Sequence, residues 1–199
     1  MITRKEMTRI LLKEGLLSCL ANNSFETVTV TSLCKASGIT RSTFYLHYSN
    51  IMEIVDDLVD DAIAYSKPGM VDNNNLQTIA NTLSAASNSV SLREAYDSIF
   101  DRLPLCQRII RHKKYLPLFL DEQISEYVLQ RIIGREKDRQ GLVMAEALGI
   151  SFDVGVSVFV FLVHGLYAIN KEYKWTQSDE WLEAQKVIFE LVYRGLQSK

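Results

Sequence analysis

The chain has 199 residues, of which 47% are hydrophobic and 23% charged, as in ordinary globular proteins. Nine glycines and three prolines leave long runs without a breaker, which favours helices over a β fold with many turns. The formal net charge of −2 excludes a chain that is basic throughout. Residues 1–50 nevertheless carry six Lys or Arg against three Glu, and the remainder is acidic. Either chance or an anionic partner at the N-terminal end explains this asymmetry.

Two features bear on the cellular compartment. The three cysteines, Cys19, Cys34 and Cys106, are an odd number without paired spacing, so we expect small buried thiols in a reducing compartment. The N-terminus is charged from Arg4 onward and lacks a signal-peptide pattern, so we expect a cytoplasmic protein. The most apolar stretch, Phe152–Ile169, contains an uncharged run of only ten residues, too short to span a bilayer. We therefore expect no membrane partner and a helix that is buried on most of its surface.

The first predicted helix runs from about Thr3 to Asn22, and Phe25 after it is placed to fill the core of a small bundle. Its apolar residues recur three or four positions apart, which places them on one face: Met7, Ile10, Leu11, Gly15, Leu17 and Leu20.

A helix-turn-helix pattern follows. Thr29 can cap a short helix over 30–36, in which Leu33 and Cys34 face inward. Gly38 can adopt the positive φ of a tight turn, and Ile39 is its buried residue. Thr40 can cap a second helix over 41–48. Helix, short turn with glycine and helix is typical of DNA-binding hairpins, although many ordinary helical hairpins look similar by spacing alone.

The remaining elements are also predicted to be helices. Asn50 and Glu53 resemble a capping box, so a fourth helix is expected to begin there. Its acidic row is expected to be exposed and to point away from DNA: Glu53, Asp56, Asp57, Asp60 and Asp61. Further helices are predicted at about 75–89, 92–103, 105–112, 116–134, 138–172 (with a break near Gly149) and 178–197, and 134–141 is predicted to be a loop.

The segment Thr27 to Ser49, TVTVTSLCKASGITRSTFYLHYS, resembles the DNA-binding signature of the TetR (tetracycline repressor-like) family. Three groups of residues carry the resemblance: Gly38-Ile39-Thr40 at the turn, Thr43-Phe44-Tyr45 in the core, and His47-Tyr48 at the aromatic end. The close match covers about residues 5–60. It implies an all-α fold of nine or ten helices, with a three-helix head at 1–48 and an effector-binding and dimerisation body at 49–199. Within that body, residues 49–66 would be a linker helix.

The resemblance also implies a function. Most members of the family repress transcription and release DNA when a small molecule binds, although activators occur. The partners would be a palindromic double-stranded operator, a second copy of the chain bound through the two C-terminal helices, and an unidentified effector. No cofactor is expected.

The second helix of the motif would enter the major groove, so its first turn, Thr40, Arg41, Ser42 and Thr43, would reach base edges. Arg41 can hydrogen-bond guanine through both arms of its guanidinium group. Thr29, Tyr45 and His47 are better placed for phosphates, although Tyr45 could be a core residue. Two departures from the family weaken the case: Ile51 stands where a phosphate-binding lysine is usual, and Thr31 replaces a basic residue. Either DNA binding is weakened or other cations compensate: Arg4, Lys5, Arg9 and Lys35.

In the body, an aromatic set could line an effector pocket, although aromatics at helical spacing are more often plain core: Tyr96, Phe100, Tyr115, Phe119, Tyr127, Phe159, His164 and Tyr167. The basic cluster at 108–114 could bind an acidic effector, but a solvated patch is the simpler interpretation. We find no catalytic constellation and no metal-ligand spacing, so an enzyme is not expected. The alternative to a regulator is a dimeric binding or adaptor protein whose DNA binding has weakened.

Overall fold

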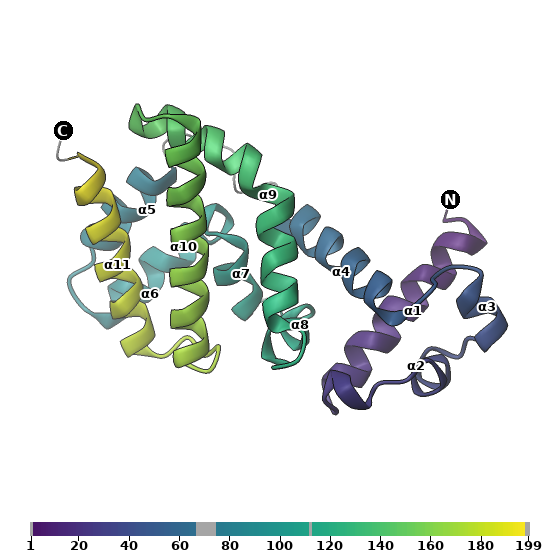
Figure 1. The fold of residues 1–199 in the computed structure, drawn as a ribbon. Helices are drawn as coiled ribbons and strands as arrows, with labels where there is room; N and C mark the ends of the chain where they lie inside the picture. Colours follow the sequence, from purple (N-terminus) through teal and green to yellow (C-terminus); the bar gives the residue numbers. More distant parts are fainter. Residues whose placement is uncertain (1, 67–74, 112, 198–199) are drawn as a thin grey trace. The chain divides into compact units, whose positions relative to one another are not determined.

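The computed structural model describes residues 2–66, 75–111 and 113–197 (Figure 1). These residues form eleven α-helices and no β-strand, so the predicted all-α fold is confirmed. The helices are α1 (Arg4–Leu20), α2 (Val30–Ser37), α3 (Arg41–Tyr45), α4 (Ile51–Ser66), α5 (Asn75–Ser84), α6 (Ser89–Ser98), α7 (Leu105–Arg111), α8 (Leu116–Leu120), α9 (Ser125–Leu148), α10 (Phe152–Glu172) and α11 (Asp179–Gln197).

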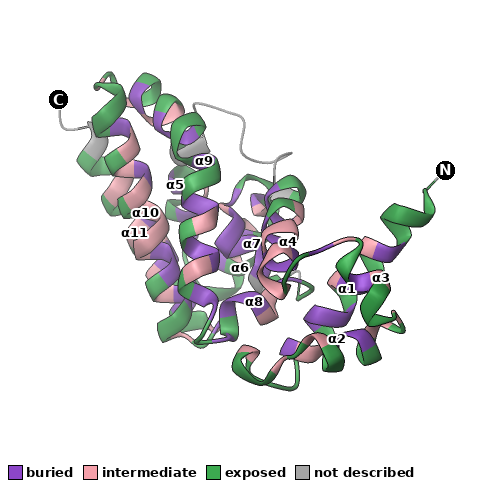
Figure 2. Ribbon diagram, turned by 45° about the vertical axis from the view of Figure 1, so that its right-hand side comes forward, coloured by how far each residue is buried: buried purple, intermediate pink, exposed green. Residues whose placement is uncertain are grey.

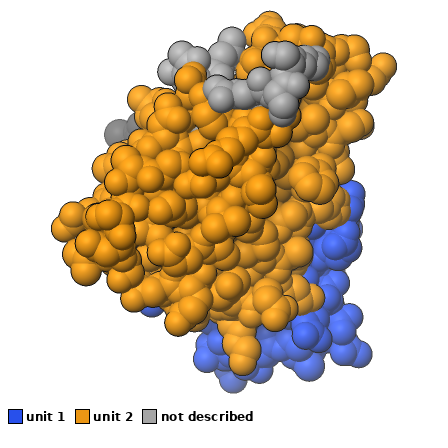
Figure 3. Space-filling model, turned by 90° about the vertical axis from the view of Figure 1, so that its left-hand side faces the viewer, with its two compact units in different colours: residues 1–64, 112–134 blue, residues 65–111, 135–199 orange. Residues whose placement is uncertain are grey.

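The chain divides into two compact units (Figure 3). Unit 1 comprises residues 1–64 and 112–134, and unit 2 comprises residues 65–111 and 135–199. Both units are therefore built from two separate stretches of the chain. The compact unit that holds the helix-turn-helix extends well beyond residue 48, because it also contains most of α4, all of α8 and the first part of α9.

The buried face of α1 agrees with the predicted one in its second half only. Gly15, Leu17 and Leu20 are buried as predicted. Leu12 and Leu16, which were not predicted, are fully buried, whereas Met7, Ile10 and Leu11 are exposed. The predicted face mixed two stripes of the same helix, because leucine and isoleucine occur on both sides of it. The buried stripe packs on α2, as expected for a helix that supports a helix-turn-helix.

Asp121 ties the α8–α9 hairpin to the N-terminal segment of unit 1. Its Oδ1 accepts hydrogen bonds from the first backbone N–H groups of the 122–125 turn, at Gln123 (2.9 Å) and Ile124 (3.2 Å). Its Oδ2 accepts the backbone N–H of Phe25 at 2.7 Å. One buried carboxylate therefore satisfies donors from two parts of the chain that lie 96 residues apart.

Several helix boundaries correct the sequence predictions. The predicted helix 116–134 is broken at Asp121, where α8 ends and the turn into α9 begins. The predicted loop at 134–141 is helical, within α9. The break near Gly149 is confirmed, since this residue has a φ of +61° that a glycine adopts without steric cost. In addition, α3 ends at Tyr45 and not at Tyr48.

In unit 2, α9 and α10 approach closely at a pair of glycines. A Cβ added to Gly155 would lie 2.3 Å from the Gly141 carbonyl oxygen and 2.9 Å from the Ala145 backbone nitrogen. Only a residue without a side chain fits such a crossing. The second glycine of α10, Gly165, has no atom within 4 Å of its added Cβ, so α10 has one crowded face and one open face.

The expectation that the apolar helix at 152–169 is buried on most of its surface is wrong. In α10, only 22% of the most apolar window is buried, and intermediate and exposed residues follow the helix along its length (Figure 2). At 21 residues it is long and apolar enough to cross a membrane, which the ten-residue uncharged run did not predict. Core and interface helices of water-soluble proteins pass the same test, so the helix alone does not indicate a membrane.

Candidate nucleic-acid interface

Capping residues set the helix boundaries of the helix-turn-helix. The Thr29 side chain and Ser32 form a reciprocal capping box at the start of α2, and the Thr40 hydroxyl accepts the backbone N–H of Thr43 at the start of α3. Between the two helices, Gly38 has a φ of +67° and caps α2. Leu33 and Cys34 are buried as predicted, whereas Ile39 is half-buried.

The first turn of α3 presents Arg41 to solvent. Arg41 is exposed and has no ion-pair or hydrogen-bond partner among the described residues. Its neighbours Ser42 and Thr43 are held by their hydroxyls, which lie 3.0 Å and 2.8 Å from the Thr40 hydroxyl. The predicted base-reading residues thus lie together, with one free guanidinium beside a cluster of three hydroxyls.

The aromatic residues at the end of the motif differ in their burial. Phe44 is fully buried, and Tyr45 packs edge-on against it with 53% of its side chain exposed, so Tyr45 is not a core residue. His47 is half-buried, and its Nδ1 is buried without a hydrogen-bond partner among the described residues. Because Nδ1 is buried, the ring nitrogen that remains for an external contact is Nε2.

Thr29, which caps α2, and Thr31, which lies inside it, differ in how free their hydroxyls are to bind a phosphate. The Thr29 hydroxyl is engaged with Ser32, 3.2 Å away, and with the backbone N–H of the same residue. Thr31, one residue into the helix, is exposed. Of the two, Thr29 acts first as a helix cap, and any phosphate contact would have to share its hydroxyl with that cap.

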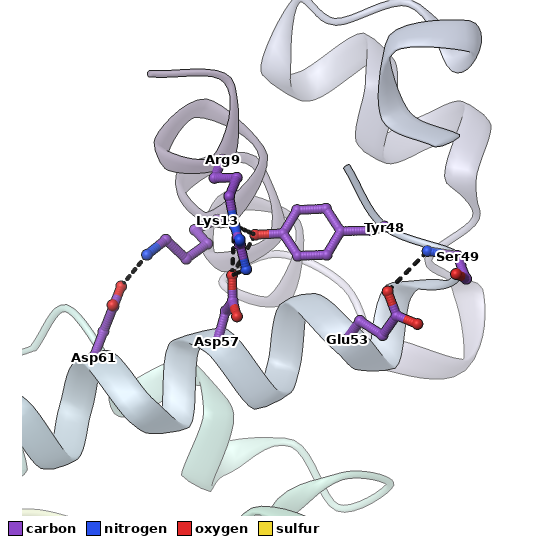
Figure 4. A network of polar contacts seen from close by, with 7 residues as sticks. All are labelled: Arg9, Lys13, Tyr48, Ser49, Glu53, Asp57 and Asp61. Atoms are coloured by element: carbon purple, nitrogen blue, oxygen red, sulfur yellow. Dashed lines mark hydrogen bonds and ion pairs between the residues drawn. The ribbon is translucent and has the colours of Figure 1, made fainter. Parts of the chain in front are cut away.

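The acidic row of α4 is not the solvated face that its sequence predicted. Asp57 accepts hydrogen bonds from Arg9 at 2.5 Å and from the Tyr48 hydroxyl at 2.6 Å, and Asp61 pairs with Lys13 at 2.5 Å (Figure 4). Burial, followed by the hydrogen bond to Asp57, raises the pKa of the Tyr48 hydroxyl. The network joins α1, the end of the helix-turn-helix and α4.

Other residues of the row are engaged as well. The Glu53 carboxylate accepts the Ser49 backbone N–H at 2.8 Å at the start of α4 (Figure 4). Asp56 accepts the Tyr127 hydroxyl at 2.8 Å and pairs with Arg131 at 2.7 Å, so it joins α4 to α9 within unit 1.

These pairs change which cations remain for DNA. Arg9 was one of four residues expected to compensate for Ile51 and Thr31, but its charge is neutralised by Asp57. Arg4, Lys5, Lys35 and Arg41 are exposed and have no ion pair among the described residues. Four free cations therefore remain in the N-terminal part of unit 1.

The predicted effector-lining residues are distributed over both units. Tyr115, Phe119 and Tyr127 belong to unit 1, and the other five belong to unit 2: Tyr96, Phe100, Phe159, His164 and Tyr167. Tyr96, Tyr115, Phe119, Phe159 and Tyr167 are buried, whereas the remaining three are intermediate.

Two polar links in unit 2 were not predicted. The Tyr96 hydroxyl donates to Gln107 at 3.1 Å, and Gln107 donates to Gln185 at 2.9 Å. The Trp181 indole donates to Asn170 at 3.0 Å. All five side chains are at most 1% exposed. The sequence could have indicated these links only through Gln107, Asn170 and Gln185, whose amide side chains occur at positions where the helical spacing predicts core residues.

The basic cluster at 108–114 is not a single solvated patch. Arg108 is 3% exposed, Arg111 is exposed and pairs with Asp97, and Lys114 pairs with Glu14 at 2.7 Å. His112 lies outside the described residues. Among the described residues no group of three or more His, Cys, Asp or Glu could hold a metal ion.

The comparisons with known proteins add little to this geometry. No family model and no curated protein matches the chain. Among solved structures, the chain is similar to the crystal structure of the TetR family repressor AlkX from Dietzia sp. strain DQ12-45-1b, which is implicated in biodegradation of n-alkanes. The two share 13% sequence identity over 95% of each chain with a TM-score of 0.43, too low a likeness to carry a conclusion about this protein.

Proposed function

We propose that this protein is a sequence-specific, DNA-binding transcriptional regulator that reads the major groove with α3. One observation carries the proposal: a doubly capped helix-turn-helix presents the unpaired, exposed Arg41 on the first turn of its second helix. Arginine in that position can donate to both O6 and N7 of a guanine. The hydroxyls of Ser42 and Thr43 lie beside it for further base or phosphate contacts.

Phosphate binding would fall to a reduced set of groups. Arg4, Lys5 and Lys35 are exposed and form no ion pair among the described residues, and Tyr45 and His47 each offer a side-chain donor. Each neutralised phosphate contributes a salt-dependent slope of about −0.9 in log K against log salt. We therefore expect a shallower salt dependence than a protein with unpaired basic residues at positions 9, 31 and 51 would show.

Two further elements complete the proposed function. A homodimer formed by α10 and α11 would bring two recognition helices to a palindromic operator at a spacing of about 34–36 Å. A small molecule that binds the DNA-free state better than the DNA-bound state would release the operator, which makes the protein a repressor. Such a regulator would act in the cytoplasm.

The test is selection of duplexes from a random pool, followed by binding titrations at several salt concentrations. Arg41→Ala is expected to cost about 1–3 kcal/mol of binding and to relax the preference at one base pair of each half-site. His47→Ala serves as the control, because the loss of a phosphate contact weakens binding to all sequences alike. If the unaltered protein selects no sequence and is not retained by duplex DNA at low salt, a dimeric binding or adaptor protein becomes the better assignment.

A further inference from the structure

Arg108 is a buried cation that forms no ion pair with any described residue. It lies on α7 of unit 2, where five consecutive residues, Leu105 to Ile109, are all buried. Among the described residues no carboxylate lies within ion-pair distance of its guanidinium group. Arginine is almost never fully buried unless it is paired, since the interior solvates a charge poorly.

The acceptors that Arg108 does have are neutral. Its Nη2 donates to the backbone carbonyl of Tyr65 at 2.7 Å and its Nη1 to that of Asp101 at 3.3 Å. The Tyr65 carbonyl is in the last turn of α4, whose negative end is equivalent to about half an elementary charge. No ion pair with a described residue therefore compensates the guanidinium charge: the Asp101 carboxylate attracts it from beyond ion-pair distance, and the Tyr65 ring, 5.2 Å from Cζ, adds only a weak attraction.

The unfilled hydrogen-bonding positions in this interior are donors. Arg108 Nε is buried and has no acceptor among the described residues. Gln185 Nε2 is in the same condition, because Gln185 accepts from Gln107 through its oxygen and leaves its own N–H groups unused. A second buried amide nitrogen of unit 2, Gln177 Nε2, also has no partner. The group that would complete the hydrogen bonding of Arg108 itself is an acceptor with a negative charge.

We propose that Arg108 is the anion-binding residue of an effector site in unit 2 and that the effector is a small organic carboxylate. A carboxylate is the group that matches the guanidinium fork, since two of its oxygens accept two parallel N–H bonds. The Nε edge of Arg108 is the side on which such a bond is still unmade. The buried neighbours of Arg108 on α7 include the hydrophobic Leu105 and Ile109 and the amide Gln107, so the rest of the ligand would be largely apolar.

The position of Arg108 also connects the ligand to the DNA-binding function. The same guanidinium that would bind the carboxylate holds the last turn of α4, and the first turn of α4 follows directly on the helix-turn-helix. A carboxylate that draws the guanidinium away competes with the Tyr65 carbonyl. This regulatory role rests on the proposed function, whereas anion binding at Arg108 does not.

The experiment is a titration of the ¹⁵N-labelled full chain, without DNA, monitored at the arginine Nε–H resonances. The Arg108 resonance is recognised by its slow exchange with water and by its absence from Arg108→Lys. Benzoate and hexanoate are expected to shift it saturably, whereas benzamide and hexanamide, which have the same shape without the charge, leave it in place. Arg108→Gln is expected to weaken carboxylate binding by at least about tenfold, the cost of one charge-assisted bond.

Arg111→Gln is the matched control, since it removes an exposed arginine from the same helix and should leave carboxylate affinity unchanged. If neither carboxylate shifts the resonance, or if the amides shift it equally, the proposal is overturned. A response to inorganic phosphate without one to the carboxylates overturns the assigned ligand class. These readouts use protein alone, so a failure of DNA binding would contradict the proposed function and leave this result standing. Should Arg108→Gln not fold, the comparison of acid and amide in the unaltered chain still decides.

Discussion

Ile51 stands half-buried at the first position of α4, one residue after Asn50, which caps the helix. In the family that the sequence resembles, a lysine in this place contacts a phosphate. An apolar side chain there removes one cation from the phosphate-binding set, and the pairing of Arg9 with Asp57 removes another. If the protein binds DNA as proposed, the loss of these two cations predicts a moderate affinity.

We predict that Ile51→Lys tightens binding to all duplexes alike and steepens the salt dependence by about 0.9 per head, because it adds one phosphate contact. Binding titrations from low to moderate salt measure both effects. Val90→Lys adds the same charge to an exposed position of α6 in unit 2 and should leave the slope unchanged. An unchanged slope for Ile51→Lys would show that the start of α4 does not lie beside the DNA backbone.

Cys106 gives a prediction about pH. Burial raises the pKa of its thiol to about 12. In the unfolded chain a thiol titrates near pH 8.5, so the unfolded state loses its proton first as pH rises. The free energy of unfolding should therefore fall by up to about 1.4 kcal/mol per pH unit from Cys106 alone between about pH 9 and pH 12, and this contribution is complete below pH 8. Denaturant titrations at several pH values, compared with Cys106→Ala, isolate it; equal slopes for the two proteins would contradict it.

At the scale of helices, the crossing of α9 and α10 depends on Gly155. We predict that Gly155→Ala destabilises the fold by about 1–3 kcal/mol, the usual cost of overpacking, because its Cβ would meet backbone atoms that cannot move aside. Gly134→Ala, in an open position of α9, should instead stabilise by about 0.5–1 kcal/mol, since alanine is the better helix former. Thermal or chemical denaturation compares the two. A neutral Gly155→Ala would mean that the helices do not approach as closely as described.

The sequence predicted helices well where caps and breakers mark their ends. Thr29, Gly38 and Thr40 define α2 and the start of α3, and Gly149 ends α9. It predicted poorly where a charged run continues a helix, as at 134–141, because long-range packing and not local polarity decides that segment. The acidic row of α4 shows the same limit for the site: its partners Arg9, Lys13 and Arg131 come from distant parts of the chain, and spacing cannot reveal such pairs.

For the molecule as a whole, the homodimer stays a prediction. The structure changes which residues of α10 and α11 can form its interface. Within the two C-terminal helices, Trp181, Leu182 and Phe189 are at most 3% exposed inside one chain, and Gly155 packs on α9, so none of them is available to a second copy. What α10 leaves in water is an apolar stripe with Phe161 (70% exposed) and Val154 (49%) beside the open Gly165, and α11 adds the similarly exposed Val187 and Leu191. An exposed stripe of this kind marks a partner surface.

We predict that the protein sediments as a homodimer at micromolar concentration and that Phe161→Glu shifts it to the monomer, because a carboxylate would be buried unpaired in the interface. Val90→Glu, at a position of α6 that is 68% exposed, is the control and should remain dimeric. If the unaltered chain sediments as a monomer, the dimer prediction is wrong, and a second copy does not cover the exposed apolar stripe of α10.

The two-part composition of unit 1 has a consequence for biosynthesis. When the ribosome has completed residue 64, the acceptor for the Phe25 N–H has not yet been made, since it is the carboxylate of Asp121. The same holds for Arg131, the partner of Asp56. Unit 1 is therefore completed only when residues 112–134 have emerged, after the first stretch of unit 2. Nascent chains released early from translation would carry α1 to α3 without the contacts that complete their unit.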